Sequence, residues 1–496
     1  MSNKIKLGWG RRDVTPPRPC LIGGQMYMRI SADVLDPIMT TALTIENGED
    51  MVIFVSLDAV VCRGRILDRV KAKLSERRPD IDGQKVLMSA THSHTTPQLS
   101  SNPEVEELVP PEAGNVMFGD EMADYTAEKI TEAIIESFDG RAEGGFAYGY
   151  GFATVGHSRR TLYSRDLSVG APNDSMHAVN GFCQMYGNTN DVDFVGYEKG
   201  TESFLNALFT YDAEGKLTGM IANVPCPSQC SEQRSALSAD YWHNVRVAVK
   251  ERFGDVYVLP QCAAAGDLSP RQLHYNDAEQ RRFNLKYGEG TDIDMGRRRD
   301  IAERIVAGLA EIEAWASKDI KTEAVLKHTV IEVNLAKQMI SERQYQESLE
   351  GIVGAKAVVP KLKGEWYEDF KRKTRRLTGI ARYAEIIESY EAQQTQPTVT
   401  TESHIIRLGD IAFASNRFEL FMDYEQRIQA RSPAQQTFIV QLAAQPGPGG
   451  GTYLPTANAK ANKGYSASIF DGDVDASGGP VLVEETLKKL NEIFAE

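Results

Sequence analysis

Cysteine is scarce in this sequence. The six cysteines among 496 residues are Cys20, Cys62, Cys183, Cys226, Cys230 and Cys262. Their spacing is not the dense pattern of a small secreted domain built on disulfides. The sequence also has no run of 18 apolar residues that could span a membrane, and no apolar segment near Met1 that could direct secretion. These absences predict a cytoplasmic protein without stable membrane association, in which an important cysteine would be a metal ligand or a reactive thiol.

Basic residues are outnumbered by acidic ones, 55 to 69, which gives a formal net charge of −14. No basic cluster offsets this charge, and an acidic protein is repelled by phosphate backbones, so we exclude nucleic acid as a partner and expect a small-molecule substrate. The proportions of 42% hydrophobic and 25% charged residues are typical of globular proteins. There is no tandem repeat and no long flexible linker, so we expect residues 1–496 to form a single domain.

Two histidines, His92 and His94, follow the apolar run Val86–Met88. In a strand, residues i and i+2 point to the same side, so both imidazoles could reach one metal ion, or one could bind the ion while the other transfers protons. The alternative is a pair of histidines satisfied by hydrogen bonds at the end of a strand.

Other apolar strands also end in polar turns. The run Met51–Leu57 ends at Asp58, Gly219–Val224 leads into Pro225–Cys230, and Val256–Leu259 leads into a turn that contains Cys262. Helical patterns separate several of these strands. Open α/β sheets place their chemistry at strand ends, so the pattern predicts an α/β protein with the site at these turns.

Three other segments have distinctive compositions. Residues 336–395 are rich in Lys, Arg and Glu and are broken by Pro360, which predicts a solvated helical hairpin that covers the pocket, forms an oligomer contact or only decorates the surface. Residues 164–200 read as loops and as a candidate substrate lid. Ser238 is the expected N-cap of a helix that contains Asp240, which could cap that helix itself or bind a ligating side chain.

Three motifs, in this order, carry a family resemblance. They are Gly10–Pro17 (GRRDVTPP), Thr91–Pro97 (THSHTTP) and Gly266–Pro270 (GDLSP). With a late Glu and Tyr, they resemble the catalytic domain of the neutral/alkaline ceramidase family. The resemblance implies a mixed-sheet α/β (α+β) fold over residues 1–496, with 336–395 as a helical insertion and without the family's C-terminal immunoglobulin-like domain.

The resemblance also implies a zinc site. The family's ligand positions fall on His92, Cys226, Glu419 and Tyr453. Cys226 stands where the family has a second histidine, and a cysteine binds zinc once it is a thiolate. Two alternatives stay open, namely that His243 supplies the missing imidazole or that the metal is weakly held or absent.

Three further positions are implied to act in catalysis. His94 resembles the residue that assists proton transfer, and Arg159 the active-site arginine, with Arg160 as its alternative. Ser269 matches a serine that is either a nucleophile or part of a structural turn.

We therefore expect a zinc-dependent hydrolase in which metal-activated water attacks an amide C–N bond. The absence of an evident membrane anchor favours a polar, non-membrane substrate. The alternatives are a hydrolase or lyase that acts on a carbohydrate or polyol derivative, and a catalytically silent binding protein. Assembly as a homo-oligomer is left open.

Overall fold

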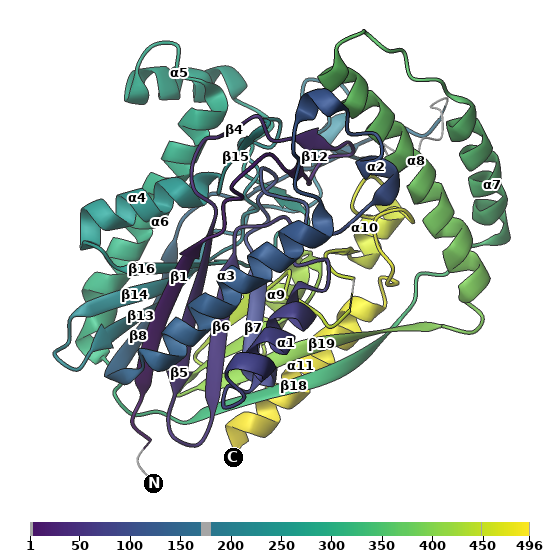
Figure 1. The fold of residues 1–496 in the computed structure, drawn as a ribbon. Helices are drawn as coiled ribbons and strands as arrows, with labels where there is room; N and C mark the ends of the chain where they lie inside the picture. The colour runs from purple at the N-terminus through teal and green to yellow at the C-terminus, as the bar shows by residue number, and fades with distance from the viewer. Residues whose placement is uncertain (1–2, 170–179, 448, 496) are drawn as a thin grey trace.

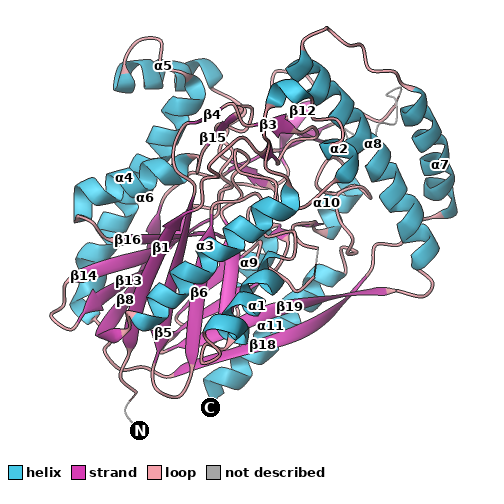
Figure 2. Cartoon of the chain, viewed as in Figure 1, coloured by secondary structure: helices cyan, strands magenta, loops and turns pink. Residues whose placement is uncertain are grey.

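The centre of the fold is an eight-stranded mixed sheet, seen in a computed structural model that describes residues 3–169, 180–447 and 449–495 (Figures 1 and 2). Its order is β16-β14-β13-β8-β1-β5-β6-β7. Neighbours are antiparallel except for the parallel pairs β6–β7 and β14–β16. The strands are β1 (Lys6–Asp13), β5 (Met39–Glu46), β6 (Met51–Leu57), β7 (Val86–Ala90), β8 (Ala142–Phe152), β13 (Phe204–Asp212), β14 (Leu217–Val224) and β16 (Tyr257–Cys262).

A four-stranded sheet, in the order β18-β19-β20-β22, packs against the first sheet. The aromatic rings of Phe54 and Phe413 lie 4.7 Å apart across this contact, and Phe413 stacks on Phe438 at 4.4 Å. Burial of apolar side chains between the sheets is the main stabilising contribution of this layer. The strands are β18 (Leu326–Ala336), β19 (Thr398–Leu408), β20 (Ile411–Ser415) and β22 (Gln436–Val440).

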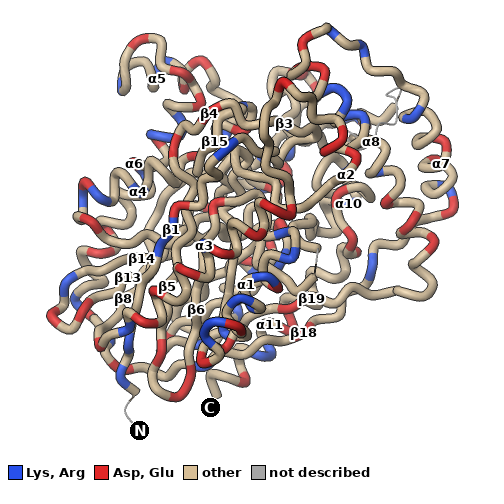
Figure 3. The backbone as a smooth tube through the Cα atoms, in the orientation of Figure 1, with Lys and Arg blue, Asp and Glu red and all other residues tan. Residues whose placement is uncertain are grey.

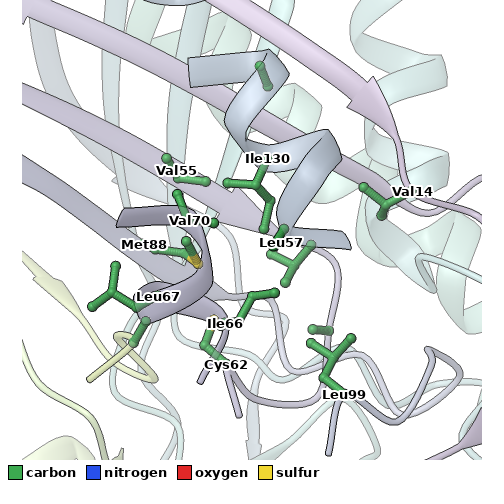
Figure 4. Close-up of a cluster of buried hydrophobic side chains, with 14 of the residues drawn as sticks. Val14, Val55, Leu57, Cys62, Ile66, Leu67, Val70, Met88, Leu99 and Ile130 are labelled. Carbon is green, nitrogen blue, oxygen red and sulfur yellow. The ribbon is translucent and has the colours of Figure 1, made fainter. Parts of the chain in front are cut away.

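Helices cover the outer faces of both sheets. Helices α1 and α3 pack on the side of β5–β7, where Val55, Leu57, Ile66, Met88 and Ile130 belong to one buried cluster (Figure 4). Helices α4 and α6 pack on β8, β13 and β14, and α9 and α11 on the second sheet. These helices are α1 (Ile66–Arg77), α3 (Gly119–Asp139), α4 (Tyr241–Phe253), α6 (Ile293–Ala316), α9 (Met422–Gln429) and α11 (Gly478–Ala495).

The motif at Gly10–Pro17 serves this packing. A Cβ atom on Gly10 would lie 2.1 Å from the carbonyl oxygen of Ala133 in α3, so only glycine lets the helix approach β1 this closely. Helix–sheet contact therefore accounts for the glycine of this motif.

The remaining elements are short or peripheral. The helices are α2 (Pro103–Glu106), α5 (Asn276–Tyr287), α7 (Glu342–Ala357), α8 (Trp366–Ala392) and α10 (Ala457–Asn462), and the 3-10 turns are Gly83–Lys85, Pro111–Ala113 and Ser317–Asp319. The strands are β2 (Leu21–Ile22), β3 (Arg29–Ile30), β4 (Asp33–Val34), β9 (His157–Ser158), β10 (Arg160–Tyr163), β11 (Cys183–Met185), β12 (Phe194–Tyr197), β15 (Ala236–Leu237), β17 (Leu268–Ser269), β21 (Glu419–Leu420) and β23 (Tyr453–Leu454).

Some local predictions were wrong. The N-cap of α4 is Asp240, not Ser238, and the Asp240 carboxylate accepts hydrogen bonds from the backbone of Tyr241 and Ser231. Glu419 lies in the short strand β21, which no pattern in the sequence predicts. Residues 164–200 include strands β11 and β12, while 170–179 lie outside the described residues, so the predicted lid is untested there. The helices α7 and α8 lie within the predicted 336–395 segment.

Candidate active site

The His92–His94 loop leaves the end of β7 and is fixed by its backbone. Thr91 N donates to Leu57 O, Ser93 N to Ala59 O, and Ser228 Oγ to Thr91 O. His92 itself has φ of +60°, a region that non-glycine residues enter at a cost of about 1–3 kcal/mol. The surrounding hydrogen bonds hold the ring in this strained position, which is typical of a functional site.

His92 is buried and its ring has a defined proton. Nδ1 lies 2.8 Å from the carbonyl oxygen of Val60, which can only accept, so Nδ1 carries a hydrogen. This Nε2 lies 3.2 Å from His94 Nε2 and 3.3 Å from Glu419 Oε2. The loop therefore presents a basic nitrogen to a carboxylate that is distant in the sequence.

Glu419 and Tyr453 are brought together by a small parallel sheet. They are register partners in β21 and β23, and Glu419 N donates to Thr452 O. Gly266 of the GDLSP motif passes behind this pair, where an added Cβ would lie 2.3 Å from Glu419 O. The motif thus has a packing reason for its glycine, because any side chain there would displace the Glu419 backbone.

Arg159 completes this side of the site. Its Nη2 donates to the Tyr453 hydroxyl at 3.0 Å and to Gly266 O at 2.8 Å, and it lies 3.8 Å from Glu419 Oε2. The alternative, Arg160, instead pairs with Glu198 and donates to Lys463 O. Of the two arginines, Arg159 is therefore the one that contacts predicted site residues.

The charges around Glu419 determine its protonation state. Burial alone would raise the pKa of its carboxyl, but His92, Arg159 and the Tyr453 hydroxyl hold that pKa at about 2. Burial raises the pKa of Tyr453 well above its usual value, although Arg159 opposes the shift. The site therefore combines a carboxylate, a neutral phenol and a buried guanidinium.

His94 has partners that the sequence did not suggest. Its Nδ1 lies 3.2 Å from Glu232 Oε2, and its Nε2 lies 2.9 Å from the amide nitrogen of Gln229. Glu232 is held in turn by Arg271 at 2.9 Å and by Gln25 at 3.1 Å. Burial lowers the pKa of His94, with Glu232 opposing the shift, and Glu232 itself has a pKa of about 2 because His94 and Arg271 outweigh its burial.

Arg29 connects the loops around His94. One of its terminal nitrogens donates to the carbonyl oxygens of Gly23 and His94, and the other to those of Glu232 and Arg234. Its side chain is fully buried. No local pattern in the sequence marks these residues, since Gln229 and Glu232 lie in a loop without periodicity and Arg29 lies in the two-residue strand β3.

Cys226 is close in sequence to this loop but faces elsewhere. Its Sγ contacts the carbonyl oxygens of Val155 and Pro227, and burial raises the pKa of the thiol well above its usual value. Across residues 3–169, 180–447 and 449–495, no group of three or more His, Cys, Asp and Glu side chains could hold a metal. The predicted set that includes Cys226 is therefore not assembled here.

The alternative ligand, His243, also faces other groups. Burial lowers its pKa, and the charges that act on it are those of Asp36, Asp58, Arg246 and Arg298. Its backbone nitrogen donates to Asp240 O at the start of α4. His243 therefore lies in the first turn of α4 among these charges, which do not favour it as the missing ligand.

Hydrogen bonds of Ser269 and Asp267 also hold the GDLSP turn in place. Ser269 Oγ accepts from the backbone of Arg271 and from the Tyr186 hydroxyl, each at 3.2 Å. Asp267 accepts from Met422 N at the start of α9, and burial raises the pKa of Asp267 to about 6. These contacts favour the structural-turn alternative for Ser269, and its catalytic role stays a prediction.

Known proteins resemble this chain in sequence and in fold. No protein-family model matches the sequence. Over 332 residues the chain is 24% identical to the neutral ceramidase of Pseudomonas aeruginosa, a region that covers 64% of this chain and 43% of that protein. The crystal structure of neutral ceramidase from Pseudomonas aeruginosa superposes with a TM-score of 0.65 at 16% identity, covering 99% of this chain and 75% of that one. The chain has the neutral ceramidase fold.

A structure described as a ceramidase complexed with C2 gives the same TM-score of 0.65 at 14% identity, with 99% of this chain and 75% of that chain covered. The predicted resemblance to the neutral ceramidase catalytic domain and the predicted α/β fold class are confirmed. The chain spans less than half the length of its curated neutral ceramidase relative. Among the described residues, no helix is both long and apolar enough to cross a bilayer.

Proposed function

We propose that this neutral ceramidase-like chain is a metal-dependent hydrolase that cleaves an amide C–N bond in a polar small molecule. The observation that carries the proposal is the convergence of His92, Glu419, Tyr453 and Arg159, which come from four separate segments of a fold shared with neutral ceramidases. A buried group of charged and polar residues, one of which, His92, has a strained backbone, is typical of an active site.

The donor chemistry supports zinc as the metal. Imidazole and carboxylate are common zinc ligands, and His92 already has its other ring nitrogen bound to a carbonyl oxygen, as ligating histidines usually do. Arg159 beside the Tyr453 hydroxyl favours the ionised form that a metal needs. We therefore propose His92, Glu419 and Tyr453 as ligands, and keep Cys226 as a prediction for the fourth.

Zinc in this position supplies a Lewis acid that polarises a carbonyl and lowers the pKa of water. We propose that His94 Nε2 accepts the proton that the attacking water loses. The Glu232 carboxylate beside Nδ1 favours the tautomer with hydrogen on Nδ1, which leaves Nε2 as the acceptor. The Arg159 guanidinium would stabilise the negative charge that develops on the carbonyl oxygen. The proton held by His94 then passes to the leaving amine.

The residues beside His94 support a polar substrate. Gln229 and Glu232 lie beside its ring, and Gln25 and Arg271 contact Glu232. The Oε1 atom of Gln229 is buried without a hydrogen-bond partner. A buried acceptor of this kind is stabilised by a donor on a bound molecule. The same lining favours the second candidate, a hydrolase or lyase for a carbohydrate or polyol derivative.

Metal analysis and substrate turnover test the proposal together. We expect stoichiometric zinc in the purified protein, loss of zinc in His92→Ala and Glu419→Gln, and no loss in His274→Ala, which removes an exposed histidine beside Tyr197. Soluble N-acyl amines should release free amine only when zinc is present, and more rapidly than a short-chain ceramide analogue. Zinc-free protein with unchanged turnover would refute the metal, while turnover of sugar derivatives without amide cleavage would select the second candidate.

A separate variant tests whether Cys226 is a zinc ligand. Cys226→Ala should leave the zinc content unchanged if the thiol only packs against Val155. Loss of zinc in this variant, with an unchanged circular dichroism spectrum, would instead establish Cys226 as the fourth ligand.

A further inference from the structure

Arg63 lies between the loops that carry His92 and Tyr453. The carbonyl oxygen that holds His92 Nδ1 at 2.8 Å belongs to the residue three positions before Arg63. Arg63 Nε donates to Gly450 O at 3.1 Å, and its Nη2 donates to Gly451 O at 3.4 Å. Tyr453 follows Gly451 by two residues. These contacts fix the guanidinium beside the backbone that leads to two of the proposed zinc ligands.

No acid neutralises Arg63 at short range within the described part of the chain. Helix α1, which follows it, carries several basic residues (Figure 3), but Arg69 and Arg77 pair there with acidic residues of α3. Near the site, Arg159 and Arg271 each have a carboxylate oxygen within 4 Å. Among the residues that the structure describes, no carboxylate lies within 4 Å of Arg63, and its Nη1 donates to none of them. The positive charge of Arg63 is therefore available to a bound molecule.

The charge that acts most strongly on Arg63 is that of Glu419. The surroundings of the guanidinium desolvate it and lower its pKa, and the carboxylates of Glu419 and then Glu385 oppose this shift. The Arg63 side chain is nevertheless exposed, as is Glu385 on α8. Glu419 has its own counter-charge in Arg159 at 3.8 Å, and Glu385 acts only from beyond 4 Å. Neither therefore replaces a carboxylate in direct contact with Arg63.

We propose that Arg63 binds a carboxylate of the substrate, so that the amide cleaved at this site is an anionic one. This inference rests on the proposed hydrolase function and names its substrate class. A guanidinium has five N–H donors in a planar fork, and the two contacts with carbonyl oxygens leave three of those of Arg63 open. A carboxylate can accept from Nη1 and Nη2 together, and hydrogen bonds between two ions are about twice as strong as neutral ones.

The alternative role for Arg63 is to hold the backbone of Gly450 and Gly451. That role uses Nε and one hydrogen of Nη2, and it leaves Nη1 and the exposed positive charge without a function beside Glu419. The two roles predict different behaviour. Loss of a backbone contact impairs the turnover of every substrate alike, whereas loss of a carboxylate site impairs only the substrates that carry a carboxylate.

Matched pairs of substrates test the proposal. An N-succinyl amine has its carboxylate on the acyl side of the amide and an N-acetyl amino acid has it on the amine side, and each is compared with the neutral compound that has a carboxamide instead. For at least one pair, the wild-type kcat/KM for amine release should be about 10–100-fold higher with the anionic compound. Arg63→Met should bring this ratio close to one, and Arg63→Lys should retain part of it. Arg65→Met, which removes an exposed arginine that pairs with Asp68, should retain the wild-type ratio.

A wild-type protein that does not discriminate within either pair would overturn the proposal, as would a preference that survives in Arg63→Met. An equal loss with anionic and neutral compounds, in a variant with an unchanged circular dichroism spectrum, would show that Arg63 only holds the loop. If no compound is cleaved, the hydrolase proposal fails, and isothermal titration with the same compounds then tests Arg63 separately. Binding of an anionic compound that weakens about tenfold in Arg63→Met would support the carboxylate site, and equal binding would refute it.

Discussion

Glu419 and Tyr453 stand opposite each other as backbone partners in the β21–β23 pair, and the same guanidinium, that of Arg159, lies within reach of both side chains. The backbone pairing therefore fixes the separation of two predicted ligands independently of any metal. Preorganisation of this kind means that the charges of the site must be stabilised by each other in the protein without zinc.

Removal of the Glu419 carboxylate should therefore destabilise the fold. Glu419→Leu leaves the buried Arg159 without its anionic neighbour, and breaking such a pair costs about 3–5 kcal/mol in the free energy of unfolding. Urea unfolding of metal-free protein measures the loss. The double variant Arg159→Met/Glu419→Leu should recover part of it, and a double variant no more stable than Glu419→Leu would show that the charges are not coupled. Glu388→Leu, at an exposed position on α8, is the control.

Replacement of Glu232 should affect the reaction more than the fold. Glu232→Gln removes the charge beside His94 Nδ1, and replacement of a group that orients a site residue in this way typically costs about 10–100-fold in activity. We expect the loss in kcat, with KM little changed and partial rescue in Glu232→Asp. The matched control is Glu368→Gln on α8. A fall in kcat that is accompanied by a matching loss of thermal stability would indicate a purely structural role for Glu232.

Gly266 should not tolerate a methyl group. Gly266→Ala places a Cβ 2.3 Å from Glu419 O, and such overpacking costs about 1–3 kcal/mol or displaces the backbone. The unfolding temperature and the zinc content should both fall, because the Glu419 side chain moves when its carbonyl group is displaced. Gly200→Ala, where a Cβ meets nothing within 4 Å, should leave both unchanged. A stable, zinc-loaded Gly266→Ala would contradict the packing argument.

The buried Glu425 carboxyl predicts a pH-dependent stability. Burial, reinforced by Glu202 and Asp267, raises the pKa of Glu425 from its ordinary 4.5 to about 8, although the Ala264 backbone nitrogen opposes the shift. Between these two pH values the folded protein keeps a proton that the unfolded chain has lost, so its contribution to stability falls as the pH rises to about 8. Glu425→Gln should flatten this decline in urea unfolding at pH 6 and 8.5, and an unchanged slope would exclude Glu425 as its source. Glu388→Gln should retain it.

The sequence predicted the parts of the site that lie at strand ends. Met51–Leu57 and Val86–Ala90 are apolar enough to be recognised as buried strands, so Asp58 and His92 follow at a known edge. Motif order then linked His92 to Glu419 and Tyr453, and the structure places these three residues together. The strand at Glu419 was missed, because a two-residue strand has no periodicity of its own.

The sequence could not predict the partners of His94. Glu232 and Gln229 reach it, and Arg271 reaches Glu232, from loops whose paths depend on tertiary contacts. No spacing relates these residues to the THSHTTP motif. Cys226 stays a prediction as a ligand. Its position in the motif order suggested that role, whereas in the structure its Sγ contacts the carbonyl oxygens of Val155 and Pro227, and burial raises the pKa of the thiol.

Arg29 has a consequence for how this protein can change. Four carbonyl oxygens from three loops depend on its two terminal nitrogens, so these loops form one mechanical unit without any shared strand or helix. A lysine has one charged nitrogen and cannot reproduce the planar fork. The loops tied to Arg29 can therefore move only together, and His94 moves with them.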